Sequence, residues 1–228
     1  MTPAFSLLPF CLLGSAALAA PVLDDAVRQR AEELTRLGMH AGIVIAVIDG
    51  KDSAVFGFGS AQPGKAGKPG TDTVYQIGSI TKTMTGLLLA DAVAQGKATL
   101  DTPVAQLLPG YAIPAFDGRQ ISVLDLATHT SSLPRLPDNF APANPANPYA
   151  DYTEERQRQF LAGYRLPHAP GTAFDYSNIG YAVLGTALAR QAGGSYEALL
   201  QSRIAAPLGM RSTSNQPTHG MLARLAPG

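Results

Sequence analysis

The sequence has little cysteine and no excess of charge of either sign. Its 228 residues include one cysteine and four histidines, with no C-x-x-C or H-x-x-x-H spacing, which argues against a disulfide framework or a structural zinc site. The 17 Lys and Arg balance the 17 Asp and Glu, so the basic surface that a nucleic-acid binder or a binder of anionic membranes needs is missing. We therefore expect a small or neutral partner and no nucleic acid. A hydrophobic content of 46% suits one globular domain or two small ones.

Charged side chains are absent from residues 1–20. An apolar run at residues 10–13 precedes small residues that end in Ala17-Leu18-Ala19, which is typical of a secretory signal with an A-x-A cleavage site. The stretch is too short and too rich in Gly and Ala to span a bilayer. We predict a signal peptide at residues 1–19, no stable membrane insertion after its cleavage, and a secreted or periplasmic location in a bacterium. The only cysteine, Cys11, would leave with the signal.

The next part of the chain predicts one helix and a β-hairpin. Apolar residues recur at helical spacing between Asp24 or Asp25 and Gly38, which are suitable start and stop residues. Residues 42–48 are an apolar, β-branched run, followed by an Asp-Gly turn signal and a second strand over residues 54–58. We expect a loop over residues 61–72 and a brief return to the sheet at residues 74–77.

After Gly78 the pattern is helical. Residues 80–94 are apolar nearly all round, which predicts a central buried helix. Further helices are expected at residues 122–128, 153–162, 178–191 and 196–205, and a long loop or lid at residues 131–152, which hold five prolines. Two or three strands cannot cover themselves, and no partner strand is predicted later. Either another chain completes the sheet or the sequence stops early.

Residues 79–82, Ser-Ile-Thr-Lys, place an S-x-x-K motif at the first turn of the predicted buried helix. Positions i and i+3 share a helix face, so the Ser79 hydroxyl and the Lys82 amine come within hydrogen-bond reach. The positive end of the helix disfavours an ammonium ion there, which favours a lysine that acts as a general base. The Ser79 N–H is offered to a developing oxyanion. The alternative is that Ser79 only caps the helix while Lys82 reaches solvent.

A second motif, Tyr176-Ser177-Asn178, precedes another apolar helix. S-x-x-K and Y-x-N occur together by chance in about one chain in twenty. His129 could suggest a Ser-His-Asp hydrolase, but the sequence has no G-x-S-x-G elbow. We interpret His129 as part of a run that closes the C-terminus of a helix.

Four segments together resemble a known family: residues 76–82, 126–134, 174–181 and 207–210. They are similar to serine β-lactamases of class C and their relatives, the AmpC and AmpH-like penicillin-binding proteins, DD-peptidases and esterases. Residues 127–135 are especially similar to the AmpH-like carboxypeptidase/endopeptidase branch. The resemblance implies an α/β (α+β) fold of the β-lactamase/transpeptidase type, in which an antiparallel sheet flanked by helices accompanies a mostly helical domain.

The resemblance also implies roles for the motif residues. Ser79 would be the acylated nucleophile, Lys82 its activating amine, Tyr176 the proton shuttle, and Asn178 a hydrogen-bond partner for the lysine and the substrate amide. The chain would be a serine acyl-hydrolase that cleaves β-lactam or D-Ala-D-Ala-type amide bonds of a small molecule or a peptidoglycan peptide, with no metal or other cofactor. Two alternatives stay open, an esterase with the same site and a non-catalytic penicillin- or peptidoglycan-binding module. The oligomeric state is not predicted.

A third motif of the family, Lys-Thr-Gly or His-x-Gly on a strand, has no credible match. His40-Ala41-Gly42 has the letters but lies before the first predicted strand. We therefore expect a C-terminally truncated hydrolase with little or no turnover by itself. In this interpretation residues 20–78 are the N-terminal part of the α/β domain, residues 79–228 hold the nucleophile helix and a mostly helical domain, and the C-terminal strands of the sheet are missing.

Overall fold

The computed structural model describes residues 20–62, 64, 67–145 and 147–226, and the predicted signal peptide lies outside these residues. The chain divides into two compact units. Among the described residues, the smaller unit comprises those from residue 20 to Tyr75 together with residues 224–226, and the larger unit lies within Gln76–Ala223. Residues 224–226 thus belong to the same unit as the N-terminal helix and hairpin.

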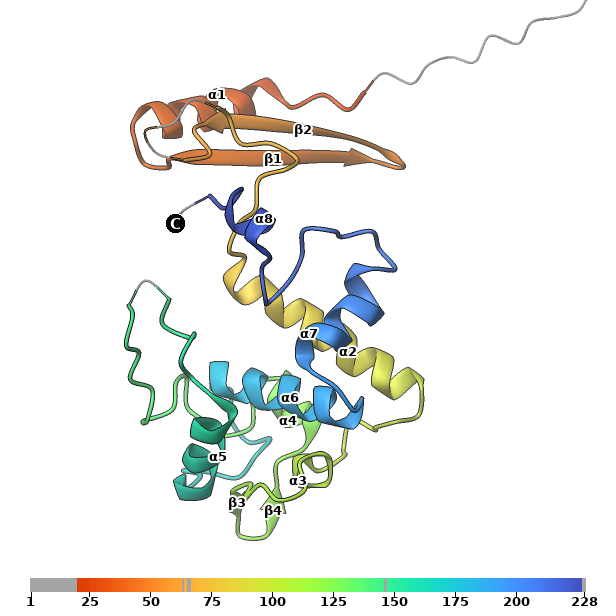
Figure 1. Ribbon diagram of the computed structural model, residues 1–228. Coiled ribbons are helices and arrows are strands. Elements are labelled where there is room, and N and C mark those ends of the chain that lie inside the picture. Colours follow the sequence, from red (N-terminus) through yellow and green to blue (C-terminus); the bar gives the residue numbers. More distant parts are fainter. Residues whose placement is uncertain (1–19, 63, 65–66, 146, 227–228) are drawn as a thin grey trace, which may run out of the picture. The chain divides into compact units, whose positions relative to one another are not determined.

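The smaller unit consists of a helix packed on a β-hairpin (Figure 1). Helix α1 (Asp25–Arg36) begins after Asp24, whose carboxylate accepts the backbone N–H groups of the first turn. Strands β1 (Gly42–Asp49) and β2 (Asp52–Gly59) pair antiparallel over their whole length. The predicted helix and hairpin are therefore confirmed. Leu23, Ala31 and Phe58 form the buried core of this unit.

The predicted return of residues 74–77 to the sheet is wrong. Val74 instead forms a single parallel bridge with Leu225. Its N–H donates to the Arg224 carbonyl at 3.0 Å, and its carbonyl accepts the Ala226 N–H at 2.8 Å. Because the last described residues satisfy both backbone groups of Val74, this segment has no need of the hairpin as a partner. The same bridge shows that a residue late in the sequence pairs with the smaller unit, which was not expected.

The larger unit is mostly helical, as predicted. Its helices and strands are α2 (Thr81–Ala94), α3 (Val104–Leu107), β3 (Ala115–Phe116), β4 (Arg119–Gln120), α4 (Val123–Ala127), α5 (Glu154–Gly163), α6 (Asn178–Gln191), α7 (Tyr196–Leu200) and α8 (His219–Leu222). A 3₁₀ turn, Gly78–Ile80, precedes α2, and a π-helical turn, Gln201–Ala205, continues α7. Elements α3, α8 and the β3–β4 hairpin were not predicted, because two to four residues are too few to show a period. The described part of residues 131–152 is irregular, as expected.

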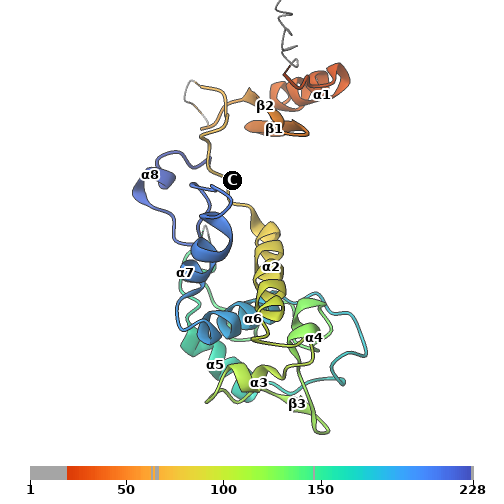
Figure 2. The same cartoon turned by 90° about the vertical axis from the view of Figure 1, so that its right-hand side faces the viewer.

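Helix α2 is buried on one face only. It packs against α6 and α7 (Figure 2), and Leu88 and Leu89 are buried there. Leu87 of the same helix is 53% exposed, and Ile80, directly before the helix, is 59% exposed. The helix is therefore only partly buried, whereas the sequence predicted a central buried helix. An apolar pattern shows that a face can be buried, but only a neighbouring element buries it.

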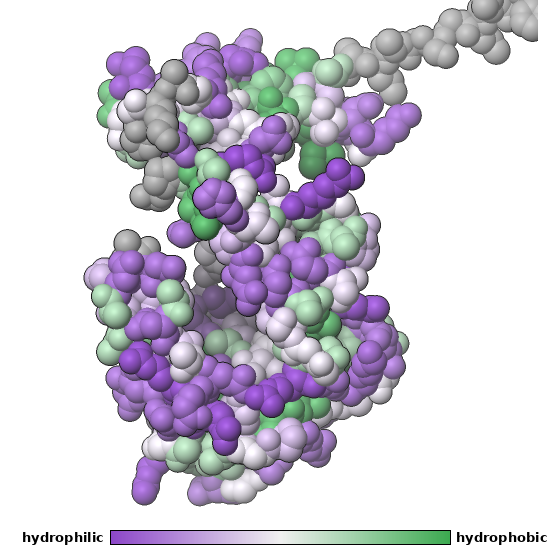
Figure 3. Space-filling view, viewed as in Figure 1, coloured by the Kyte–Doolittle hydropathy of each residue, from purple (hydrophilic) through white to green (hydrophobic). Residues whose placement is uncertain are grey.

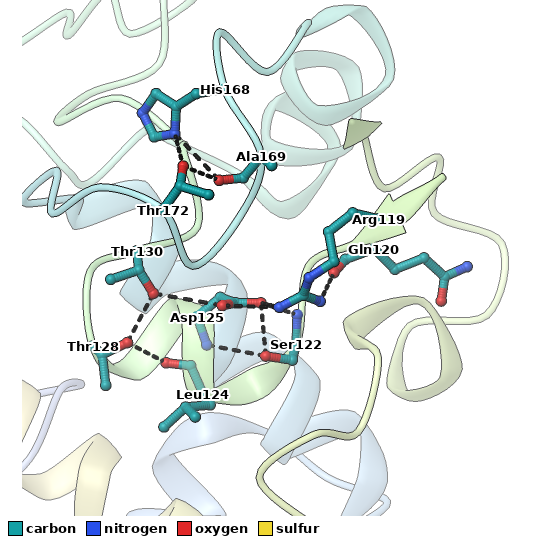
Figure 4. Close-up of polar contacts among 10 residues, drawn as sticks. All are labelled: Arg119, Gln120, Ser122, Leu124, Asp125, Thr128, Thr130, His168, Ala169 and Thr172. Carbon is teal, nitrogen blue, oxygen red and sulfur yellow. Dashed lines mark hydrogen bonds and ion pairs between the residues drawn. The ribbon is translucent and has the colours of Figure 1, made fainter. Parts of the chain in front are cut away.

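Short helix α4 is fixed firmly at its start (Figure 4). The Ser122 N–H donates to the Asp125 carboxylate at 2.8 Å, and the Asp125 N–H donates to Ser122 Oγ at 3.2 Å, which is a capping box. Arg119 forms an ion pair with the same carboxylate at 3.1 Å. Asp125 is buried, so its charge is compensated by this arrangement. The loop that follows α4 therefore starts from a rigid support.

The surface of the larger unit that faces the viewer in Figure 3 is mostly hydrophilic. Among the described residues, none of the helices has the length and apolar character that crossing a membrane requires. Within the same ranges, His, Cys, Asp and Glu side chains do not gather in threes that could hold a metal ion.

Candidate active site

The four residues singled out by the two motifs lie together in the larger unit. Ser79 Oγ is 2.7 Å from Tyr176 Oη. Lys82 Nζ donates to Asn178 Oδ1 at 2.8 Å and to Ser79 Oγ at 3.3 Å. Ser79 is exposed, and the other three are half-buried. A hydroxyl that can be reached from solvent thus lies between Tyr176 and Lys82, and Lys82 is in turn held by Asn178.

Local backbone geometry places the serine and the lysine. Gly78 has a φ of +50°, a conformation that favours glycine, and it begins the 3₁₀ turn that contains Ser79. The turn continues directly into α2, where Lys82 lies in the first helical turn. Positions three residues apart on a helix share a face. The S-x-x-K spacing therefore brings the two side chains together with no help from distant residues.

The Tyr-Ser-Asn segment is held by the loop that follows α4. Ser177 is fully buried; its hydroxyl donates to the Pro134 carbonyl at 2.7 Å and accepts the Gly180 N–H at 2.8 Å. This second bond caps the start of α6. The Asn178 N–H donates to the Arg135 carbonyl at 3.0 Å. Pro134 and Arg135, at the end of the stretch 127–135 that resembles AmpH-like proteins, thus anchor the segment that bears Tyr176 and Asn178.

Positive charge surrounds the Tyr176 phenol. Lys82 Nζ lies 4.8 Å from the centroid of its ring, and the Arg135 guanidinium lies 5.3 Å from it. Hydrogen bonding to Lys82, followed by that to Ser79, holds the pKa of Tyr176 below its usual value of 10.0, and the charges of Lys82 and Arg135 act in the same direction. Both effects favour the phenolate, because a nearby cation and a donated hydrogen bond stabilise the charged form.

A pocket of about 460 Å³ opens beside Lys82 between α2, α6 and α7. Thr85 and Tyr196 line it and share a hydrogen bond of 2.8 Å, and Tyr181 and Asn215 lie along its wall. Sites for small molecules usually have volumes of roughly 300–1,000 Å³. The pocket therefore has room for a small molecule or for part of a peptide next to the hydrogen-bonded residues.

Sequence reasoning missed three residues that surround the tyrosine. Arg135 was part of a resembling segment, but it was given no role. Tyr181 is one turn of α6 beyond Asn178, and its ring is 5.6 Å from Lys82 Nζ. For His129 the sequence predicts only a place in the run that closes a helix. The i, i+3 spacing of Asn178 and Tyr181 was a usable signal, whereas the positions of Arg135 and His129 depend on how the loop folds back.

Comparison with known proteins now identifies the family. A model of the Beta-lactamase family matches residues 23–227. The chain belongs to the β-lactamase family. This β-lactamase-family chain is 33% identical over 203 residues to the D-alanyl-D-alanine-carboxypeptidase/endopeptidase AmpH of Escherichia coli strain K12, covering 89% of this chain and 52% of AmpH. It is 28% identical to a β-lactamase of the same strain, covering 86% of this chain and 49% of that protein. The chain spans about half the length of these relatives.

Solved structures agree with this assignment. The β-lactamase/D-alanine carboxypeptidase of Yersinia pestis, crystallised with citrate, superposes with a TM-score of 0.81 at 34% identity, covering 88% of this chain and 57% of that one. A class C β-lactamase superposes with a TM-score of 0.74 at 25% identity, covering 89% of this chain and 53% of that one. The predicted β-lactamase/transpeptidase-like fold and the resemblance to AmpH-like and class C proteins are therefore confirmed.

Proposed function

We propose that this β-lactamase-family protein is a serine acyl-hydrolase that cleaves β-lactam or D-Ala-D-Ala-type amide bonds through an acyl-enzyme on Ser79. One observation carries the proposal: Ser79 Oγ lies 2.7 Å from a tyrosine and 3.3 Å from a lysine that is itself held by Asn178. A serine with an adjacent base, oriented by a third group, has the arrangement of an activated nucleophile. The names of the AmpH and β-lactamase relatives support this class of substrate.

Tyr176 is the better placed of the two bases. Its oxygen is closer to Ser79 Oγ than Lys82 Nζ is, and its lowered pKa favours the phenolate more than in an ordinary tyrosine. In this proposal Ser79 Oγ attacks the amide carbonyl carbon while its proton passes to Tyr176. Lys82 stabilises the phenolate before the transfer and is fixed by Asn178. The Ser79 N–H, at the start of α2, helps to hold the oxyanion of the tetrahedral intermediate.

Collapse of the intermediate completes acylation. The carbon–nitrogen bond breaks, Tyr176 returns the proton to the leaving nitrogen, and an ester to Ser79 remains. A water molecule then attacks the ester carbonyl carbon and gives its proton to the Tyr176 phenolate, which Lys82 stabilises. The bond to Ser79 Oγ breaks, the proton returns to this oxygen, and the free acid leaves. These steps use only side chains, a backbone N–H group and water, so none of them requires a metal or another cofactor.

Three substrates separate this function from its two alternatives. The natural full-length protein should release D-alanine from a D-Ala-D-Ala peptide, or open a chromogenic cephalosporin, well above a protein-free background. An esterase with the same site would use the same nucleophile, Ser79. Turnover of a short-chain p-nitrophenyl ester, with no turnover of the two amide substrates, would therefore indicate an esterase. Binding of penicillin with no turnover of any of the three would indicate a binding module. Either result would contradict the proposal.

We also propose that the protein is exported and loses residues 1–19. The supporting observation is the uncharged, apolar segment that ends in Ala17-Leu18-Ala19. In a bacterial host that secretes the protein, N-terminal sequencing of the periplasmic form should begin at Ala20. Recovery from the cytoplasm of a chain that begins at Met1, with no periplasmic form, would contradict export. An intact chain in the periplasm would contradict the cleavage site only.

A further inference from the structure

His129 occupies a backbone position at the end of α4 where glycine is usual. Its φ is +61°, in the left-handed region. The His129 N–H donates to the Leu126 carbonyl at 3.4 Å and the Thr130 N–H donates to the Asp125 carbonyl at 2.8 Å, the bond pair of a Schellman motif. The helix is therefore closed by backbone groups, as the sequence predicted. A side chain at this position adds strain that glycine would avoid, so closing the helix does not explain the imidazole.

The imidazole instead contacts the segment that carries Tyr176. Its ring centroid lies 4.4 Å from that of Tyr176, with the planes at 35°, and 4.9 Å from that of Tyr181. Nδ1 accepts the N–H of buried Ser177 at 3.0 Å. The His129 carbonyl accepts the Asp175 N–H at 2.7 Å. His129 thus binds the residue before Tyr176 and the residue after it, and packs against the ring between them.

These contacts require a neutral imidazole. An Nδ1 that accepts a hydrogen bond carries no proton, so the hydrogen of the neutral ring is on Nε2. Burial, and then the positive charge of Lys82, lower the pKa of His129 below its usual value of 6.5. The titratable groups that face the ring are Lys82 from α2, Tyr176 itself and Tyr181 from α6. Protonation would remove the acceptor for Ser177 and would add a second cation near Lys82.

We propose that His129 is a positioning residue, whose neutral imidazole accepts the Ser177 N–H and packs on the Tyr176 phenol so that this phenol stays within hydrogen-bond distance of Ser79. The inference rests on the proposed function of Ser79 and Tyr176, because positioning has a catalytic consequence only if they react. It goes beyond that function because it assigns a role to the ring of a residue that does not touch the reacting serine.

Two substitutions separate positioning from helix closure. His129→Gly removes the ring and the acceptor but relieves the left-handed backbone, so a residue needed only to close α4 should tolerate it. His129→Asn keeps an acceptor and also tolerates this backbone, but it lacks the ring. With fluorescent penicillin, we expect the acylation rate constant to fall about 10- to 100-fold for H129G, the scale of an ångström-sized misplacement, and to fall less for H129N. The penicillin dissociation constant should change little.

The matched control is Asp117→Gly. Asp117 also has a left-handed φ, of +45°, but it is exposed in the turn of the β3–β4 hairpin. D117G should be acylated at the wild-type rate.

The pH profile gives a second test. For the wild type, the acylation rate should decline as the pH falls through the lowered pKa of His129, and this decline should be missing from the profile of H129N. Wild-type rates and an unchanged pH profile in both His129 variants would overturn the inference.

A measurement that needs no turnover keeps this inference separate from the proposed function. Ultraviolet difference titration against Tyr176→Phe gives the pKa of the Tyr176 phenol. In H129G this pKa should rise toward 10.0, because a displaced phenol loses its hydrogen bonds to Lys82 and Ser79. An unchanged phenol pKa would contradict positioning even if no variant is acylated. If the wild type is not acylated but the phenol pKa shifts, the proposed function fails and the positioning inference stands.

Discussion

Replacing Ser79 with alanine is expected to abolish covalent labelling by fluorescent penicillin and to lower turnover by as much as about 10⁶-fold, the scale seen when a nucleophilic serine is removed. The reason is that the acyl group must be carried by an oxygen whose proton a neighbouring base can accept. Ser79 Oγ meets this requirement, since it is 2.7 Å from Tyr176 Oη. Labelling is read by gel fluorescence, and the attachment site by mass spectrometry of the labelled peptide.

Thr83→Ala is the control for Ser79→Ala. Thr83 is an exposed residue in the first turn of α2, and its hydroxyl donates only to the Ile80 carbonyl among the bonds described for it. T83A removes a hydroxyl from the same helix and should be labelled at the wild-type rate. If S79A is labelled as fast as the wild type, or if the label maps to a peptide without Ser79, the assigned nucleophile is wrong.

Replacing Lys82 with methionine is expected to slow acylation by about 10²- to 10⁴-fold, the usual contribution of a positioned acid–base group. Methionine keeps an unbranched side chain but cannot donate to Asn178 or Ser79, as Lys82 does at 2.8 and 3.3 Å. Hydrogen bonding to Lys82 is the largest cause of the lowered Tyr176 pKa. The phenol pKa should therefore rise in K82M.

The sign of the pH effect follows from this shift. The phenolate is the basic form of Tyr176, so the wild-type acylation rate should increase as the pH rises through the lowered Tyr176 pKa. In K82M that increase should move to higher pH. Stopped-flow acylation across the alkaline range measures it, with Lys97→Met as the control because Lys97 is exposed beyond the end of α2. A wild-type rate in K82M, or an alkaline limb that does not move, would show that Lys82 does not act on the tyrosine.

The sequence alone determined the features that depend on neighbouring residues. A short apolar, β-branched run with an Asp-Gly turn signal predicted the β1–β2 hairpin, and helical apolar spacing predicted the main helices. The S-x-x-K motif predicted the contact between Ser79 and Lys82, since three residues on a helix bring side chains to one face. The family resemblance suggested Tyr176 and Asn178, but spacing could not place them beside Ser79, 97 positions before Tyr176.

Tertiary structure decided the features that depend on distant residues. It placed Tyr176 against Ser79 through the loop after α4, and it placed Val74 against Leu225 rather than in the hairpin sheet. It left Leu87 exposed although the helix pattern predicted burial. The His129 ring acquired its partners in the same way. The physical reason is the same in each case. A backbone group or a side chain contacts or hydrogen-bonds to whichever partner the folded chain brings near it, and the local pattern of apolar residues does not specify that distant partner.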